Sequence, residues 1–281
     1  MDQKIITLFD RFTHGGMNRR ECMEKLKTLA GGTAAAAALL PILENNYAQA
    51  EMVAEGDDRI TAETLGFEGG SGYLVKPKAE GKYPGVIVIH ENRGLNPHIM
   101  DVARRMALEG FAALAPDYLH ALGGTPADAD KARDMIGTLK PEANVATSQA
   151  ALAALKSHAA ANGKSGAMGF CWGGGAVNAL AVAGPGLSAG VAYYGAQAPA
   201  TDVPKITAPL LLHYAGLDER INAGIPAFEE ALKGAGKTYE LHIYEGANHA
   251  FNNDTNAARY NKEAADLAWG RTVEFLKKHV A

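Results

Sequence analysis

The feature that most constrains the fold is an alternation, from residue 83 to the C-terminus, between short Val-, Ile- and Leu-rich runs and longer stretches with helical spacing. The run "YPGVIVIH" (83–90) is almost continuously apolar, which is typical of a strand buried on both faces. The stretch "PHIMDVARRMALEG" (97–110) repeats apolar residues every three to four positions and closes on a glycine, as helices often do. This alternation predicts an α/β fold: an open, mostly parallel twisted sheet with helices on both faces.

The remaining elements follow from the same patterns. The segment from Arg59 to Pro77 alternates weakly around Gly69-Gly70, which predicts an antiparallel hairpin ahead of the parallel strands. Further strands are expected at 111–117, 165–170, 190–194, 208–217 and 239–246, and further helices at 144–163, 175–182, 228–233 and about 255–278.

Composition excludes several classes of partner. A net charge of −4 and a pI near 6.1 provide no basic surface for phosphates, so we expect no nucleic acid partner. No stretch reaches the roughly 18 consecutive apolar residues of a membrane span. The two cysteines, Cys22 and Cys171, are too few for a disulfide framework, so Cys171 is expected to be a free thiol. A small-molecule partner is expected, and a homo-oligomer stays open.

Residues 1–58 are interpreted as an N-terminal leader and linker, ahead of a single domain at 59–281. Arg19-Arg20 precedes a mildly apolar, Ala-rich run, and Ala48-Gln49-Ala50 suits a cleavage site with small residues. The arrangement resembles a twin-arginine export signal that ends near residue 50, which predicts a periplasmic protein. Charged residues directly after the arginine pair depart from that pattern. The alternative is a cytoplasmic protein that retains this segment as an amphipathic helix or an oligomerisation arm.

The pentapeptide Gly169-Phe170-Cys171-Trp172-Gly173 has the spacing of the G-x-S-x-G nucleophile elbow, with cysteine in place of serine. It lies between an expected strand and an expected helix, where a sharp turn would hold the thiol above the sheet. The helix N-terminus favours a thiolate, and the amide of Trp172 is the natural donor to an oxyanion. The alternative is that Cys171 is simply a small buried apolar residue.

A catalytic cysteine needs a base, and two residues that follow it in chain order can provide one. Asp218 comes just after the strand expected at 208–217, and His249 lies in the loop after the next strand. Parallel strands present such positions at the ligand crevice, and this order of acid and histidine is that of the α/β-hydrolases. Taken singly, Asp218 could be a helix cap and His249 an ordinary loop histidine.

Other chemistries find less support in the sequence. His90-Glu91 begins like the zinc motif H-E-x-x-H, but Gly94 stands where the second histidine belongs. His213 and His242 lie within apolar strands and are interpreted as core or sheet residues. The chain has neither a G-x-G-x-x-G after its first parallel strand nor a C-x-x-C motif. We therefore expect no metal and no cofactor.

Taken together, "HENRGLNPHIMDVARRMALEGFAALAPD", "GFCWGG", "LLHYAGLDERI" and "GANHAF" resemble the dienelactone hydrolase family of the α/β-hydrolase superfamily, over roughly residues 71–280. The resemblance implies a triad of Cys171, Asp218 and His249. It also implies that Glu91 contacts the resting cysteine and that Asn92 provides a second oxyanion amide.

One position departs from that family. Relatives that act on dienelactone hold the substrate carboxylate with arginines, one of them four residues after the catalytic histidine, where this chain has Asn253. Arg93 or Arg133 could compensate.

The sequence thus predicts a cysteine-nucleophile hydrolase of ester or lactone substrates, of the carboxymethylenebutenolidase type. Two alternatives stay open, a thiol redox or sensor protein and an inactive α/β-hydrolase scaffold that binds a ligand.

Overall fold

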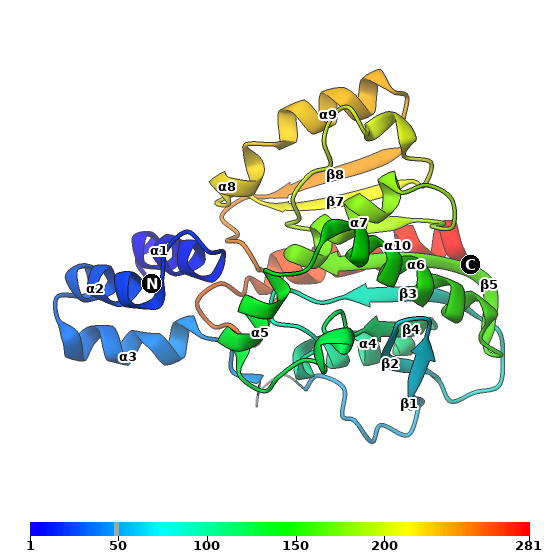
Figure 1. The fold of residues 1–281 in the computed structure, drawn as a ribbon, viewed down its shortest axis with the longest axis horizontal. Helices are drawn as coiled ribbons and strands as arrows, with labels where there is room; N and C mark the ends of the chain where they lie inside the picture. Colours follow the sequence, from blue (N-terminus) through cyan, green and yellow to red (C-terminus); the bar gives the residue numbers. More distant parts are fainter. Residues whose placement is uncertain (48–50) are drawn as a thin grey trace.

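A single eight-stranded sheet forms the centre of the computed structural model, which describes residues 1–47 and 51–281 (Figure 1). The strands are β1 (Ile60–Phe67), β2 (Gly70–Pro77), β3 (Tyr83–Ile89), β4 (Ala112–Pro116), β5 (Ala161–Phe170), β6 (Gly190–Tyr193), β7 (Leu210–Ala215) and β8 (Tyr239–Tyr244). Their spatial order is β1-β2-β4-β3-β5-β6-β7-β8. The β1–β2 and β2–β4 pairs are antiparallel and the other neighbours are parallel. The expected mostly parallel sheet with a leading hairpin is confirmed.

Helices cover both faces of the sheet. On one face α4 (Pro97–Leu108) and α10 (Lys262–Val280) pack against the strands, and on the other face lie α6 (Pro141–Ser157), α7 (Trp172–Val182) and α9 (Ile225–Gly234). The two hydrophobic clusters thus formed bury the central strands almost completely, as their continuous apolar sequences predict. Shorter helices are α5 (Ala129–Ile136), α8 (Glu219–Asn222) and the 3-10 helices η2 (His120–Leu122) and η3 (Val203–Lys205).

The structure corrects one boundary that bears on the site. The C-terminal helix begins at Lys262 rather than near residue 255. The side-chain oxygens of Asn253 and Asn256 accept hydrogen bonds from the backbone N–H groups of Thr255 and Arg259. Such local bonds favour turns over a helix, so residues 245–261 form a long loop at the carboxyl end of the sheet.

The N-terminal segment folds as three helices, α1 (Gln3–Thr13), α2 (Arg19–Ala30) and α3 (Thr33–Leu43). They share a small apolar core of their own, which includes Ile5, Phe9 and Leu26. In Figure 1 they lie together at one end of the molecule, beside α5 and α8. The predicted cleavage site Ala48-Gln49-Ala50 lies outside the described residues.

None of the helices that the structure describes has alone the length and apolar composition to cross a membrane. The helices α2 and α3, bent by 112° relative to each other, meet those criteria only as a pair.

Candidate active site

Cys171 occupies a sharp turn between β5 and α7, where its backbone adopts φ 54° and ψ −113°. Positive φ is unfavourable for a residue with a side chain, and such strain is common at functional sites. The flanking glycines make the turn possible. A Cβ on Gly169 would lie 2.2 Å from the carbonyl oxygen of Gly173, and one on Gly173 would lie 2.5 Å from the carbonyl oxygens of Ile89 and His90. The strand-to-helix elbow is therefore present as predicted.

The close approach at Gly173 brings the start of α7 against the end of β3. The Trp172 ring stacks on the His90 ring with centroids 5.3 Å apart, and Tyr118 packs edge-on against both rings. His90 is fully buried, and burial lowers its pKa, so it is neutral at pH 7. As the first residue of α7, Trp172 has an N–H without an intrahelical acceptor. Asn92, two residues after His90, lines the same cavity as Cys171.

Asp218 and His249 form a buried hydrogen-bonded pair. Asp218 caps α8 by accepting from the N–H of Ile221, and its other oxygen lies 2.5 Å from Nδ1 of His249. Burial alone raises the pKa of Asp218, but the hydrogen bond and charge of His249 outweigh it and lower the pKa below its usual range. A carboxylate only accepts, so Nδ1 of His249 carries the proton and Nε2 is available for chemistry.

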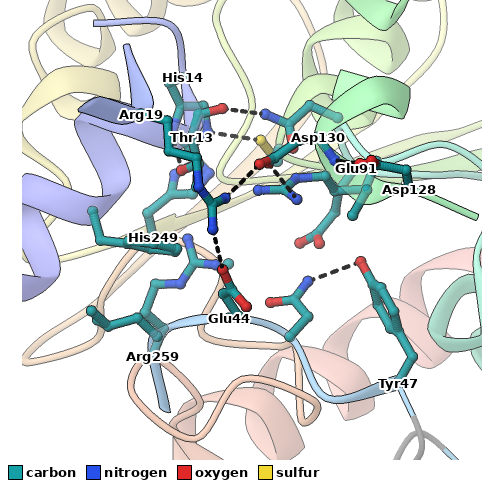
Figure 2. Close-up of a pocket in the computed structure, with 18 residues that line it drawn as sticks. Thr13, His14, Arg19, Glu44, Tyr47, Glu91, Asp128, Asp130, His249 and Arg259 are labelled. Atoms are coloured by element: carbon teal, nitrogen blue, oxygen red, sulfur yellow. Dashed lines mark hydrogen bonds and ion pairs between the residues drawn. The ribbon is translucent and has the colours of Figure 1, made fainter. Parts of the chain in front are cut away.

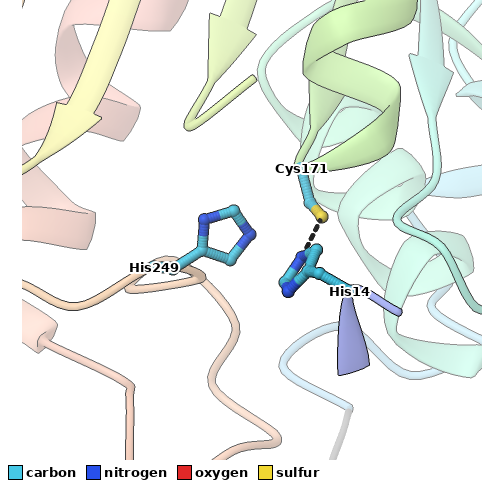
Figure 3. Close-up of side chains that lie close together, drawn as sticks. All are labelled: His14, Cys171 and His249. Atoms are coloured by element: carbon cyan, nitrogen blue, oxygen red, sulfur yellow. Dashed lines mark hydrogen bonds between the residues drawn. The ribbon is translucent and has the colours of Figure 1, made fainter. Parts of the chain in front are cut away.

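A second imidazole contacts the sulfur. Nε2 of His14, at the C-terminal end of α1, lies 3.1 Å from Sγ of Cys171 (Figure 3). The His14 and His249 rings meet edge-on with centroids 4.7 Å apart. A nitrogen from each ring and the sulfur all lie within 4.8 Å of one another.

The grouping of these nitrogen and sulfur atoms raises the question of a metal site. Around a tetrahedral zinc ion, a sulfur ligand and a nitrogen ligand lie about 3.5 Å apart. The contact between Sγ and Nε2 of His14 is shorter, at 3.1 Å, and has the geometry of a hydrogen bond. The two atoms therefore lie closer together than the sulfur and nitrogen ligands of one zinc ion would.

Glu91 is buried at the end of β3, and its carboxylate accepts a hydrogen bond from Nδ2 of Asn253 at 2.8 Å. Asn253 is itself oriented by Thr255, whose hydroxyl donates to its side-chain oxygen. The resemblance implies a contact between Glu91 and the resting cysteine. In this structure the sulfur contacts His14 instead, while Glu91 is bound to the residue that replaces the expected arginine.

The sulfur opens onto a cavity of about 480 Å³ between the sheet and the N-terminal helices (Figure 2). Arg93 lines it and lies 3.4 Å from Asp130. Arg259 also lines it, is nine-tenths buried and lies 3.6 Å from Asp10. Arg133 is instead stacked over the ring of Phe12 and paired with acidic residues of its own helix. The cavity wall also includes carboxylates, namely Glu44, Glu91, Asp128 and Asp130.

Comparison with known proteins identifies the family. Residues 71–280 match the model of the dienelactone hydrolase family, which is most of the chain. The chain belongs to the dienelactone hydrolase family. This result confirms the resemblance found in the sequence, and the protein is a hydrolase with the α/β-hydrolase fold.

Individual proteins are similar to this chain over about three quarters of its length. A protein of Bradyrhizobium sp named "Probable 2-oxo-3-(5-oxofuran-2-ylidene)propanoate lactonase" is 34% identical over 223 residues, which cover 74% of this chain and 89% of the relative. The solved structure named m3DLH superimposes with a TM-score of 0.72 at 26% identity, covering 79% of this chain and 100% of that chain. A dienelactone hydrolase from Anabaena variabilis, with a TM-score of 0.60 at 20% identity, covers 79% of this chain and 98% of its own and has the same fold.

Most of the residues singled out in the sequence meet at this cavity. Cys171, Asn92, Glu91, Arg93 and His249 all line it, and Asp218 reaches it through its hydrogen bond to His249. His213 and His242 lie in the sheet as interpreted, with His213 bonded to Tyr244 and Thr272. Sequence reasoning missed His14, which belongs to the segment interpreted as a leader.

Proposed function

We propose that this protein hydrolyses an ester or lactone by way of a thioester on Cys171. The observation that carries the proposal is the strained turn at Cys171, which holds the sulfur at the mouth of the sheet beside the Asp218–His249 pair. A nucleophile with a base, and a carboxylate that orients the base, is the arrangement that acyl transfer requires.

In the proposed reaction the Cys171 thiolate attacks the carbonyl carbon and forms a C–S bond. Backbone N–H groups of Trp172 and Asn92 stabilise the oxyanion, since they lie on the two segments that Gly173 brings into contact. The tetrahedral intermediate collapses to a thioester as the C–O bond breaks, and the leaving alkoxide takes up the proton that the thiol lost and departs as the alcohol. His249, oriented by Asp218, then takes a proton from water, which cleaves the thioester to the acid and restores the sulfur.

The charged residues of the cavity influence which ester substrates bind. We propose that Arg259 and Arg93 bind an anionic group of the substrate. Nε of Arg259 has no hydrogen-bond acceptor among residues 1–47 and 51–281, although it is buried. The Bradyrhizobium relative is named as a lactonase of a propanoate, which is a carboxylate-bearing lactone. Glu91 is proposed to keep a second anion away from the sulfur by like-charge repulsion, with Asn253 holding its carboxylate in the wall.

A substrate panel tests the proposed function. Carboxylate-bearing and neutral lactones, together with a short-chain nitrophenyl ester, are assayed with the wild type, Cys171→Ala and His249→Ala. We expect hydrolysis that falls by at least about 10³-fold in both variants. Full activity in Cys171→Ala would overturn the cysteine mechanism, and no hydrolysis of any panel member by the wild type would favour the inactive scaffold.

The arginines are tested with the same panel. Arg259→Met keeps an unbranched apolar side chain and removes the charge. We expect KM for carboxylate-bearing substrates to rise about tenfold or more while neutral substrates are unaffected. An equal effect on both classes would contradict a role in binding the anion.

A further inference from the structure

The three N-terminal helices are held against the catalytic cavity by specific polar contacts. Arg19 of α2 lies 2.7 Å from the carboxylate of Asp130, and the side chain of Asn92 donates to the backbone carbonyl of Thr13 at 2.7 Å. On another side, Asn256 donates to the carbonyl of Leu43 at 2.7 Å. These partners lie in three separate loops or helices of the hydrolase domain. The docking therefore fixes α1 relative to the residues around the sulfur.

His14 is oriented by its own helix. Its Nδ1 lies 2.8 Å from the backbone carbonyl of Asp10 and 3.3 Å from the Asp10 carboxylate. Both are acceptors, so Nδ1 carries a proton, and Nε2 is the nitrogen that faces Cys171. In the neutral ring Nε2 accepts a hydrogen bond from the S–H group of Cys171. In the imidazolium Nε2 carries a proton and donates a hydrogen bond to the thiolate. Either way, the proton lies between this nitrogen and the sulfur.

Charge around His14 favours its protonated form. Burial alone would lower the pKa of His14, but the charge of the Cys171 thiolate and the hydrogen bonds that the ring makes to Asp10 and Cys171 outweigh it and raise the pKa to about 9. Asp10 stays ionised, since the charges of the two histidines and Arg259 offset the cost of its burial and hold its pKa well below the usual range. Arg220 lies 3.7 Å from the same carboxylate.

His249 is arranged differently, because its Nε2 is buried and has no hydrogen-bond partner among residues 1–47 and 51–281. In Figure 3 the dashed contact from the sulfur leads to His14 and not to His249. One imidazole thus contacts the sulfur, while Nε2 of the other lines the same cavity without a partner among the described residues.

We propose that His14 is a second catalytic imidazole, which takes the proton of Cys171, holds the sulfur as a thiolate and passes that proton to the leaving oxygen of the substrate, while His249 acts on water. The inference rests on the proposed function only in taking Cys171 as the nucleophile. It means that the N-terminal helices contribute a catalytic residue to the active site.

The proton balance is simple. The S–H proton moves to Nε2 of His14, and the thiolate electron pair forms the C–S bond as the carbonyl becomes an oxyanion. When the C–O bond breaks, the leaving alkoxide takes the proton from His14. In the second half His249 accepts a proton from water as the hydroxide attacks the thioester, and the departing sulfur takes that proton back. Ester and water become acid and alcohol, with no change of oxidation state.

Several other ionisable groups face His14 and influence its protonation. Asp10 is the ionisable group that contacts His14 from its own helix. Cys171 and His249 contact it from the hydrolase domain. Further charged residues line the cavities that His14 lines, namely Arg19, Glu44, Glu91, Arg93, Asp128, Asp130, Arg133, Asp134, Arg220 and Arg259.

The test measures the thiol itself, independently of hydrolysis. The rate of Cys171 alkylation by iodoacetamide is followed from pH 5 to 10 in the full-length wild type and in His14→Gln, a variant that can still form a hydrogen bond but cannot take a proton. An ordinary thiol is only about 3% ionised at pH 7. We expect the variant to react about tenfold more slowly at pH 7, with its profile displaced towards higher pH. The matched control is His158→Gln, at the end of α6 near the start of β5 and paired with Glu63, which should leave the profile unchanged.

Two further arms keep the outcome clear. Free imidazole should restore part of the alkylation rate in His14→Ala, which a merely structural role would not allow. If His14→Gln fails to fold, Asp10→Asn keeps the imidazole and should shift the profile in the same direction by less. A profile identical to that of the wild type in folded His14→Gln overturns the inference. A displaced profile in a protein that hydrolyses no ester supports the role of His14 and rejects the proposed function.

Discussion

The side-chain amide of Asn253 donates a hydrogen bond to Oε2 of Glu91 at 2.8 Å, which joins the loop after β8 to the end of β3. Both residues are buried, so Asn253→Ala would leave a buried carboxylate without this donor. We expect the free energy of unfolding to fall by about 1–3 kcal/mol, measured by urea denaturation. Thr255→Val removes the hydroxyl that donates to Asn253 but keeps the backbone N–H that also does, so the free energy of unfolding should fall by less. Equal stability of Asn253→Ala and the wild type would show that the bond is dispensable.

The pair of Asp218 and His249 makes a sharper functional prediction. Asp218→Asn keeps the shape of the side chain and an oxygen that can cap α8, but its amide no longer enforces a proton on Nδ1 of His249. We expect kcat to fall by about 10³- to 10⁴-fold with little change in the melting temperature. A fall in kcat of less than tenfold in a folded variant would show that another group orients His249.

The elbow depends on the absence of a side chain at Gly173. A Cβ there would meet the backbone carbonyl oxygens of Ile89, the last residue of β3, and of His90 directly after it, which cannot move aside as a flexible side chain could. Gly173→Ala should lower the free energy of unfolding by about 1–3 kcal/mol and abolish activity, because α7 shifts away from β3. Gly175→Ala is the matched control, since its Cβ would have neighbours no closer than 3.6 Å. That variant should be neutral or stabilised by up to about 1 kcal/mol, as a helical alanine usually is.

Two buried histidines predict how stability changes with pH. Burial lowers the pKa of both His90 and His213 in the folded protein, so below their unfolded value of about 6.5 the unfolded chain binds more protons. Their contribution to the free energy of unfolding should therefore be fully present above pH 6.5 and be lost as the pH decreases from 6.5 to 5. The slope is at most about 1.4 kcal/mol per pH unit for each histidine. Urea denaturation at several pH values measures it, and a flat profile across that window would contradict the buried neutral state.

Much of the fold could be read from the sequence because its signals are local. Continuous apolar runs such as Tyr83–Ile89 identify central parallel strands, and Gly169 and Gly173 around Cys171 identify the elbow. Asp218 and His249 were found because parallel strands end at the same edge. Asn253, by contrast, ends no strand, and its pairing with Glu91 joins positions 162 residues apart, which spacing cannot reveal.

His14 escaped prediction for a different reason. The arginine pair and the Ala-rich run that follow it resemble an export signal, so the segment is interpreted as a leader or as a retained helix or oligomerisation arm, and neither interpretation places it at the active site. One signal was available: Asp10 and His14 stand four residues apart, so they meet on one side of an amphipathic helix that buries Phe9 and Phe12. Export with cleavage near residue 50 stays a prediction, and it would remove His14. The intact mass of the protein from its native host would test this.

The most direct test of the central claim is to trap the acyl group. His249→Gln is mixed with a substrate, quenched in acid and digested, and the peptide that contains Cys171 is weighed by mass spectrometry. The account predicts an added acyl mass on Cys171 that hydroxylamine removes, because deacylation is slowed while the sulfur can still attack. Turnover by the wild type with the acyl group on another residue, or on none, would contradict it.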